Sequence, residues 1–211
     1  MLSDLKMIIL GGLTGSSKTH ILNHLKESGC QVIDMEGLAN HKGSAFGALG
    51  QMPQPSTEHF ANILYSAWSN TNPEIPLLLE DESRNIGTVF MPEALYENMQ
   101  AAPAIILMMD VKTRMPRLLR EYTQFPKDEL VASVNKISKR LGGDLTREAI
   151  AAIESDNFSR AIEITLTYYD KAYLFGLNKK RPDKIIYINT ETDDIEENAA
   201  RVLEATEKIK W

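Results

Sequence analysis

Residues 12–19, which read GLTGSSKT, constrain this chain more than any other segment. They follow an apolar run at residues 7–10 and precede an amphipathic segment that begins near Ile21. The order is therefore strand, glycine-rich loop and helix, with a lysine and a threonine where the helix opens. This arrangement is typical of a phosphate-binding P-loop, whose pattern is GxxxxGK[ST].

The residue types in this loop suit the binding of an anion. Small residues let successive backbone N–H groups curve around a phosphate, and the start of the helix adds partial positive charge. Lys18 is expected to bring a full charge to the terminal phosphates and to act in catalysis, while the Thr19 hydroxyl is expected to bind Mg²⁺. The predicted phosphate-binding residues are Gly12, Thr14, Gly15, Ser16, Ser17, Lys18 and Thr19.

Ser17 departs from the pattern, which has glycine before the lysine. A serine narrows the accessible backbone angles and adds bulk beside a bound phosphate, although its N–H can still point inward. The alternative, a glycine-rich turn with no ligand, would not explain why a lysine and a threonine follow the loop at positions 18 and 19. A dinucleotide-binding GxGxxG loop also fits worse, because Gly11, Gly12 and Gly15 do not have that spacing.

The composition narrows the class of protein. The chain has 211 residues, of which 43% are hydrophobic and 25% charged, as in ordinary globular proteins. No apolar run reaches membrane-spanning length, and there is a single cysteine, so we expect no membrane partner and a cytoplasmic location. The net charge of −6 argues against indiscriminate nucleic-acid binding but allows a local basic patch.

Apolar runs and helical patterns alternate along the chain. Strands are expected at residues 6–11, 31–34, 76–80, 104–110 and 184–188, and a helix capped by Ser56 is expected to reach about residue 70. From about 112 to 176 the pattern is wholly helical, with breaks at 125–126, 142–143 and 156–157. We predict a single three-layer α/β P-loop NTPase-like domain over residues 1–211, with a mainly parallel sheet and a helical insertion or lid.

Acidic and polar residues follow two of the expected strands. Glu80 ends an apolar run as a Mg²⁺-binding carboxylate does, so Glu80 and Thr19 are the predicted metal ligands. Asp34 and Glu36 follow the second strand, where ligands bind in α/β folds, and Lys42 extends that polar loop. His41 is a candidate for proton transfer, and a structural or solvated histidine is the alternative.

The helical region carries basic and aromatic candidates. Arg114, Arg117 and Arg120 recur every three residues, so they can close over phosphates, grip a tRNA backbone or form a solvated helix face. Pro116 is expected in the first turn of their helix. Arg140 belongs to another basic cluster, and Tyr169 can stack on a base, hold a prenyl chain or pack between helices. The last helix is expected to begin with a capping box formed by Asp193 and Glu196.

Several longer segments resemble the P-loop domain of tRNA 2-selenouridine synthases, in that family's order. They are DMEGLANHKGSAFG at 34–47, ESRNIG at 82–87, REY at 120–122, RLGG at 140–143 and YYDKAY at 168–173. The resemblance favours Glu82 over its acidic neighbours as the carboxylate that faces the loop. It adds Glu82 and Arg84 to Lys18 and His41 as predicted catalytic residues. Arg84 can neutralise a diphosphate or a tRNA phosphate, or it can pair with a nearby acid. The residues expected to bind substrate or tRNA are Asp34, Glu36, Lys42, Arg114, Arg117, Arg120, Arg140 and Tyr169.

The resemblance implies a transferase that acts on the wobble uridine of tRNA. In that family 2-thiouridine is geranylated from geranyl diphosphate and then converted to 2-selenouridine with selenophosphate, so the loop ligand would be one of these donors or a nucleotide. Family members usually carry a rhodanese domain before the P-loop domain, which implies a rhodanese partner protein or a missing N-terminal domain here. Ser17, Asn40 and Lys42 stand where the family usually has Gly, His and Arg.

Two other functions remain open from the sequence. A P-loop, a carboxylate and an arginine-bearing helical lid also describe a small-molecule or nucleoside kinase. Alternatively, Ser17 could have weakened the loop, leaving a non-catalytic tRNA-binding subunit.

Overall fold

A parallel five-stranded sheet forms the centre of the molecule. The computed structural model describes residues 6–180 and 184–211. The strand order is β2-β3-β1-β6-β7, and every neighbouring pair is parallel. The strands are β1 (Met7–Gly12), β2 (Gln31–Ile33), β3 (Leu77–Glu80), β6 (Ala104–Met109) and β7 (Ile185–Thr190), which confirms the five strands predicted from the sequence.

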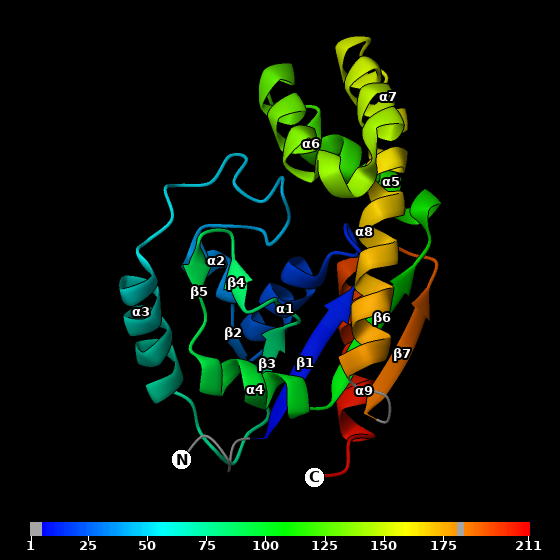
Figure 1. Cartoon of the computed structure of the whole chain (residues 1–211). Coiled ribbons are helices and arrows are strands. Elements are labelled where there is room, and N and C mark those ends of the chain that lie inside the picture. The colour runs from blue at the N-terminus through cyan, green and yellow to red at the C-terminus, as the bar shows by residue number, and fades with distance from the viewer. Residues whose placement is uncertain (1–5, 181–183) are drawn as a thin grey trace.

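Helices cover both faces of this sheet (Figure 1). On one face, α1 (Lys18–Glu27) and α9 (Ile195–Glu207) pack through apolar side chains such as Leu22 and Val202. On the other lie α3 (Thr57–Ser69), α4 (Glu93–Ala101) and the end of α8 (Phe158–Lys180). The three-layer α/β fold is therefore confirmed, and continuous apolar strands are what a sheet buried on both faces requires.

The helical insertion has a hydrophobic core of its own. It contains α5 (Val111–Tyr122), α6 (Lys127–Leu141), α7 (Gly143–Glu154) and the first part of α8, and α6 and α7 project beyond the carboxyl edge of the sheet (Figure 1). The breaks fall where the sequence predicts, since Gly142 at φ 91° separates α6 from α7. The 23-residue α8, about 35 Å long, is long enough to join this core to the main one.

Some local expectations were wrong. Helix α5 begins at Val111 with Asp110 as its N-cap, so Pro116 lies in the second turn and Arg114 inside the helix. Helix α9 is capped by Asp194 rather than by Asp193. Residues 83–103, which the sequence reading left unassigned, include α4 and a hairpin of β4 (Asn85–Ile86) and β5 (Val89–Phe90).

A short helix, α2 (Met35–Ala39), follows β2 and begins the polar loop beside the carboxyl edge of the sheet. Among the described residues, no helix is both long and apolar enough to cross a membrane.

Candidate phosphate-binding site

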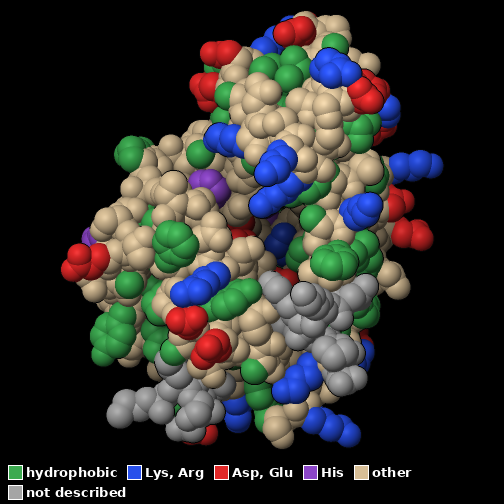
Figure 2. All heavy atoms as spheres, in the orientation of Figure 1, with side chains coloured by type: hydrophobic (Ala, Val, Ile, Leu, Met, Phe, Trp, Pro, Cys, Tyr) green, Lys and Arg blue, Asp and Glu red, His purple; other side chains and the backbone are tan. Residues whose placement is uncertain are grey.

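A pocket of about 1030 Å³ opens at the carboxyl edge of the sheet, beneath the helical insertion. Figure 2 shows the hollow near the middle of this face, with lysine and arginine side chains at its rim. Every predicted phosphate-binding residue lines this pocket: Gly12, Thr14, Gly15, Ser16, Ser17, Lys18 and Thr19. The loop between β1 and α1 is therefore open to a ligand.

The backbone of this loop explains why the pattern prefers glycine at position 17. Ser17 is the N-cap of α1 and has left-handed backbone angles, φ 65° and ψ 19°. An L-residue with a Cβ is disfavoured in this region by about 1–2 kcal/mol, whereas glycine adopts it freely. The Ser17 side chain does not cap its helix; its hydroxyl donates to Asp193 Oδ1 at 2.7 Å instead.

Lys18 and Thr19 contact residues that the sequence predicts to bind phosphate, substrate or metal. Lys18 Nζ donates to the Gly12 carbonyl at 3.2 Å. The Thr19 hydroxyl donates to Glu80 Oε1 at 2.6 Å and lies 3.3 Å from Glu36 Oε2. Glu80 is the last residue of β3 and has no exposed surface, so it lies behind Thr19 and Glu36, which line the pocket.

Three buried carboxyl groups gather around Lys18, and burial is the main cause that raises the pKa of each. Burial, reinforced by the charge of Glu36, raises the pKa of Glu80 to about 8. Burial and then the charges of Glu36 and Glu80 raise the pKa of Glu82, which is hydrogen-bonded to Glu36. Burial also raises the pKa of Glu36, although Lys18 opposes the shift. A cluster of this kind needs either a bound proton or a further cation.

The oxygen donors here fit Mg²⁺. Within residues 6–180 and 184–211, no three acidic, histidine or cysteine side chains converge as in an all-protein metal site. Mg²⁺ usually needs only one or two protein oxygens, with waters and substrate phosphates completing its octahedron. Thr19 and Glu80 would hold the ion, and the buried charge of Glu80 would then have a partner.

His41 lies in the wall of the same pocket and is only 8% exposed. Its ring is enclosed by two glycines, because a Cβ at Gly47 would come within 2.8 Å of it and one at Gly87 within 2.6 Å. Its Nδ1 atom is buried and has no hydrogen-bond partner among the residues that the structure describes. Burial and then the charge of Lys136 lower the pKa of His41, so the ring is neutral at pH 7 and can accept a proton.

The structure corrects the expected placement of two arginines. Arg84 does not line the pocket; it lies on the surface and pairs at 3.5 Å with Glu93, so it forms the ion pair of the alternative interpretation but with a more distant acid than those at 80–82. Arg114 is only 1% exposed, so it cannot belong to an exposed tRNA-binding patch. Its guanidinium donates two hydrogen bonds to the Asp170 carboxylate, at 3.0 and 2.5 Å. It also donates to the Thr14 carbonyl at 2.8 Å and so holds the P-loop backbone in place.

The other predicted substrate-binding residues divide between the pocket and the outer surface. Asp34, Glu36, Lys42, Arg117, Arg140 and Tyr169 line the pocket, whereas Arg120 is exposed and lies outside it. Glu82, the predicted catalytic carboxylate, also lines the pocket. Asp34 also caps α2 by accepting from Gly37 N at 2.7 Å. The Tyr169 ring packs edge-on against Phe46, and its hydroxyl accepts from Ala45 N at 3.1 Å, so it joins the 42–50 loop to the insertion.

Sequence reasoning missed contacts that join distant parts of the chain. The Tyr173 hydroxyl accepts from Gly12 N and donates to Asp81 Oδ2, both at 3.0 Å, at the start of the P-loop. Asp170 and Asp193 were likewise not assigned to the site. Gly12 and Tyr173 are 161 residues apart, so no local pattern indicates that they meet.

Comparison with known protein families identifies the family to which this chain is similar. The profile of the tRNA 2-selenouridine synthase AAA domain matches residues 5–205, which is nearly the whole chain. The chain belongs to this family. The resemblance that the sequence motifs indicated is thereby confirmed.

Curated members of the family are similar over most of this chain. The tRNA 2-selenouridine synthase of Shewanella frigidimarina is 36% identical over 216 residues, covering 88% of this chain and 57% of that protein. The protein of the same name from Shewanella halifaxensis is 37% identical, covering 86% of this chain and 56% of the relative. This family member therefore spans a little over half the length of these relatives.

Solved structures show only remote similarity. A tRNA isopentenylpyrophosphate transferase from Bacillus halodurans is 13% identical, with a TM-score of 0.45, and the match covers 96% of this chain and 97% of that one. A shikimate kinase from Bacteroides thetaiotaomicron is 14% identical, with a TM-score of 0.38, over 95% of this chain and 98% of that one. These scores support no conclusion about the function of this family member.

Proposed function

We propose that this chain is the P-loop part of a tRNA 2-selenouridine synthase, a transferase that binds tRNA and geranyl diphosphate to modify wobble 2-thiouridine. A rhodanese domain or partner would supply the thiol chemistry that selenation needs, and the cytoplasm, where tRNA is, would be its location. The observation that carries the proposal is a single pocket in which the P-loop faces a rim of basic and aromatic residues from the insertion.

The floor of this pocket suits a diphosphate leaving group. In geranylation the sulfur of 2-thiouridine forms a bond to C1 of the geranyl group, the C1–O bond breaks, and diphosphate leaves. Lys18 and the P-loop amides would stabilise the charge that develops on that diphosphate. When bound, Mg²⁺ would neutralise its oxygens. The neutral ring of His41 would accept the N3 proton that the uridine loses.

An apolar cavity beside the P-loop has room for the end of a hydrocarbon chain, which neither selenophosphate nor a nucleotide carries. Its volume is about 40 Å³, and its walls include Leu118, Val134 and Ala161. Thr14, Ser44, Leu118, Tyr122 and Tyr169 line both this cavity and the phosphate pocket. A ligand with a diphosphate and a hydrocarbon chain could therefore place its charge on the P-loop and direct its chain toward the cavity.

The rim of the pocket supports contact with tRNA. Lys42, Lys136 and Arg140 carry positive charge at the rim of a chain whose net charge is −6. Arg140 Nη1 donates to the Tyr168 hydroxyl at 3.3 Å, and the Tyr168 and Tyr169 rings lie 5.1 Å apart. Cations grip the phosphate backbone and aromatic rings receive unstacked bases, which is how proteins bind single-stranded RNA loops.

The test is to mix the chain with tRNA containing 2-thiouridine and with geranyl diphosphate, both with and without a rhodanese protein. We expect tRNA binding and formation of geranylated tRNA, measured by mass spectrometry of the digested nucleosides. Lys18→Met should abolish geranylation, whereas Lys26→Met, an exposed lysine on the same helix, should not. Failure to bind this tRNA, together with no geranylation in either mixture, would overturn the proposal.

Two alternatives have distinct signatures. Arg117 comes from the insertion and lines the pocket beside the P-loop, as a lid arginine of a small-molecule or nucleoside kinase would. A kinase would show Mg²⁺- and ATP-dependent phosphorylation of a small acceptor. For a non-catalytic tRNA-binding subunit, Lys18→Met would change neither tRNA affinity nor tRNA modification.

A further inference from the structure

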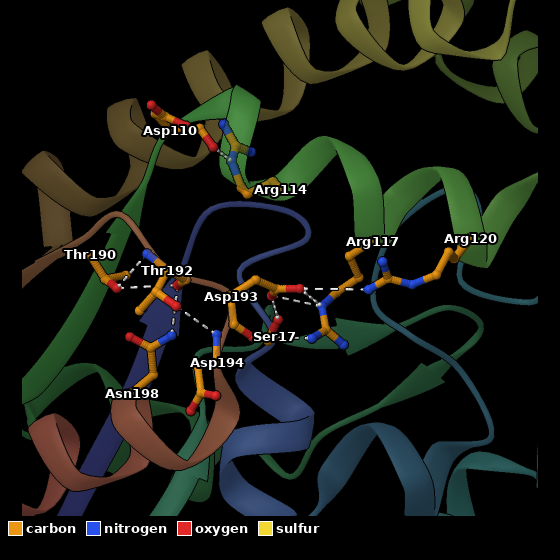
Figure 3. Close-up of polar contacts among 10 residues, drawn as sticks. All are labelled: Ser17, Asp110, Arg114, Arg117, Arg120, Thr190, Thr192, Asp193, Asp194 and Asn198. Carbon is orange, nitrogen blue, oxygen red and sulfur yellow. Dashed lines mark hydrogen bonds and ion pairs between the residues drawn. The ribbon is translucent and has the colours of Figure 1, made fainter.

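Asp193, in the loop between β7 and α9, reaches the P-loop from outside the pocket (Figure 3). Its Oδ1 accepts a hydrogen bond from the Ser17 hydroxyl at 2.7 Å. Arg117 Nε donates to both carboxylate oxygens, at 2.9 and 3.0 Å, and Arg120 Nη2 lies 3.8 Å from Oδ2. One carboxylate therefore connects the P-loop, α5 and the end of β7.

The loop that carries Asp193 is rigidly built (Figure 3). Thr192 N donates to the Thr190 hydroxyl at 3.3 Å, and Asn198 Nδ2 donates to the Thr192 carbonyl at 2.9 Å. Asp194 caps α9 through its side chain, while its own N–H donates to Thr192 Oγ1 at 3.1 Å. Because neighbouring residues hold the loop and cap the helix, the Asp193 side chain is free for the P-loop.

The contact with Ser17 bears on the shape of the anion site. Ser17 stands at a position with positive φ, so its Cβ is accommodated under strain. Ser17 lines the phosphate pocket and Asp193 does not. The hydrogen bond consequently turns the hydroxyl away from the space that a phosphate would fill, and the charge-assisted bond offsets part of the strain.

The contact with Arg117 bears on the ligand directly. The Asp193 carboxylate accepts from Arg117 Nε, and Arg117 Nη2 makes a longer contact of 3.5 Å with the Asp193 carbonyl. Among the residues that the structure describes, Nη1 has no hydrogen-bond partner. Arg117 itself lines the pocket, so a phosphate oxygen could accept from this nitrogen while Asp193 holds the rest of the guanidinium.

We propose that Asp193 is a positioning residue of the phosphate site, which keeps Ser17 out of the anion's space and holds Arg117 ready for a phosphate oxygen. The inference rests on the proposed function only in assigning a phosphate-bearing ligand to the pocket. The carboxylate does not repel that ligand, because Arg117 and Arg120 together carry more positive charge than Asp193 carries negative charge.

The test is calorimetric titration of the whole chain with inorganic pyrophosphate in Mg²⁺. Asp193→Asn should raise the Kd about tenfold, since it removes the charge that orients Arg117. Asp194→Asn is the matched control and should leave the Kd unchanged, because asparagine caps a helix as well as aspartate. If the carboxylate acted only through its negative charge, Asp193→Asn would tighten binding instead, and that result would overturn the proposal.

Two further variants keep the test decisive if Asp193→Asn folds poorly. Arg117→Lys keeps the charge but loses Nε, so it should weaken pyrophosphate binding as Asp193→Asn does. Combining Arg117→Met with Asp193→Asn should weaken binding no more than Arg117→Met alone. Unchanged affinity in Arg117→Lys, or full additivity in the double variant, would refute the positioning role alone. Absence of pyrophosphate binding by the wild-type chain would instead refute the phosphate site, and the proposed function with it.

Discussion

Replacing the buried Arg114 by methionine should destabilise the whole domain rather than weaken ligand binding alone. Arg114 is 1% exposed, and its guanidinium holds Asp170 and the Thr14 carbonyl together. Methionine fills similar space without charge. The substitution would therefore leave the Asp170 carboxylate and the Thr14 carbonyl without their main partner, beneath the P-loop.

The expected magnitude follows from these contacts. Removing one partner of a buried ion pair costs about 3–5 kcal/mol. Asp170 keeps 20% of its side chain exposed and so regains some hydration, which places Arg114→Met near the lower end, at about 3 kcal/mol. For a domain of this size, a loss of about 3 kcal/mol lowers Tm by roughly 6–12 °C.

Thermal and urea unfolding, followed by circular dichroism, measure this loss. Arg120→Met is the control on the same helix: its side chain is 67% exposed and 3.8 Å from Asp193, so its loss should be below about 1 kcal/mol. In a double-mutant cycle, Arg114→Met with Asp170→Asn should be less destabilising than the sum of the single changes by about 1 kcal/mol or more. Equal stability of Arg114→Met and Arg120→Met, with no coupling to Asp170, would refute a structural role for Arg114.

Three further outcomes are expected. Protonation of Glu80 favours the folded state, because its pKa rises from 4.5 to about 8 on folding. Without Mg²⁺, the unfolding free energy should therefore fall as pH rises through this range, and Glu80→Gln should flatten the fall in urea titrations at each pH. Ala161→Leu, which fills the apolar cavity, should weaken geranyl diphosphate binding in calorimetry while inorganic pyrophosphate still binds normally. Changing Arg140 to Gln should weaken tRNA binding and lower the salt dependence of its Kd by about one phosphate contact, and an unchanged salt slope would exclude that contact.

Features that depend on neighbouring residues were predictable from the sequence. The five strands, the P-loop and the helix breaks at 125–126 and 142–143 follow from apolar runs, glycine and proline, whose effects act over a few residues. The clustering of Glu36, Glu80 and Thr19 was also predictable, because the carboxyl ends of parallel strands share one edge of the sheet. The roles of these residues in ligand binding stay predictions.

Pairings between distant residues were decided by the tertiary structure alone. Arg114, Arg117 and Arg120 have one spacing and one chemistry, yet the first is buried against Asp170, the second faces the pocket and the third is exposed. Their surroundings come from α8 and from the loop after β7, at separations of 56 residues for Asp170 and 76 for Asp193. Helical periodicity determines which side of a helix a residue occupies, but only packing determines what lies against that side, because burial and ion pairing depend on elements that meet after the chain has folded.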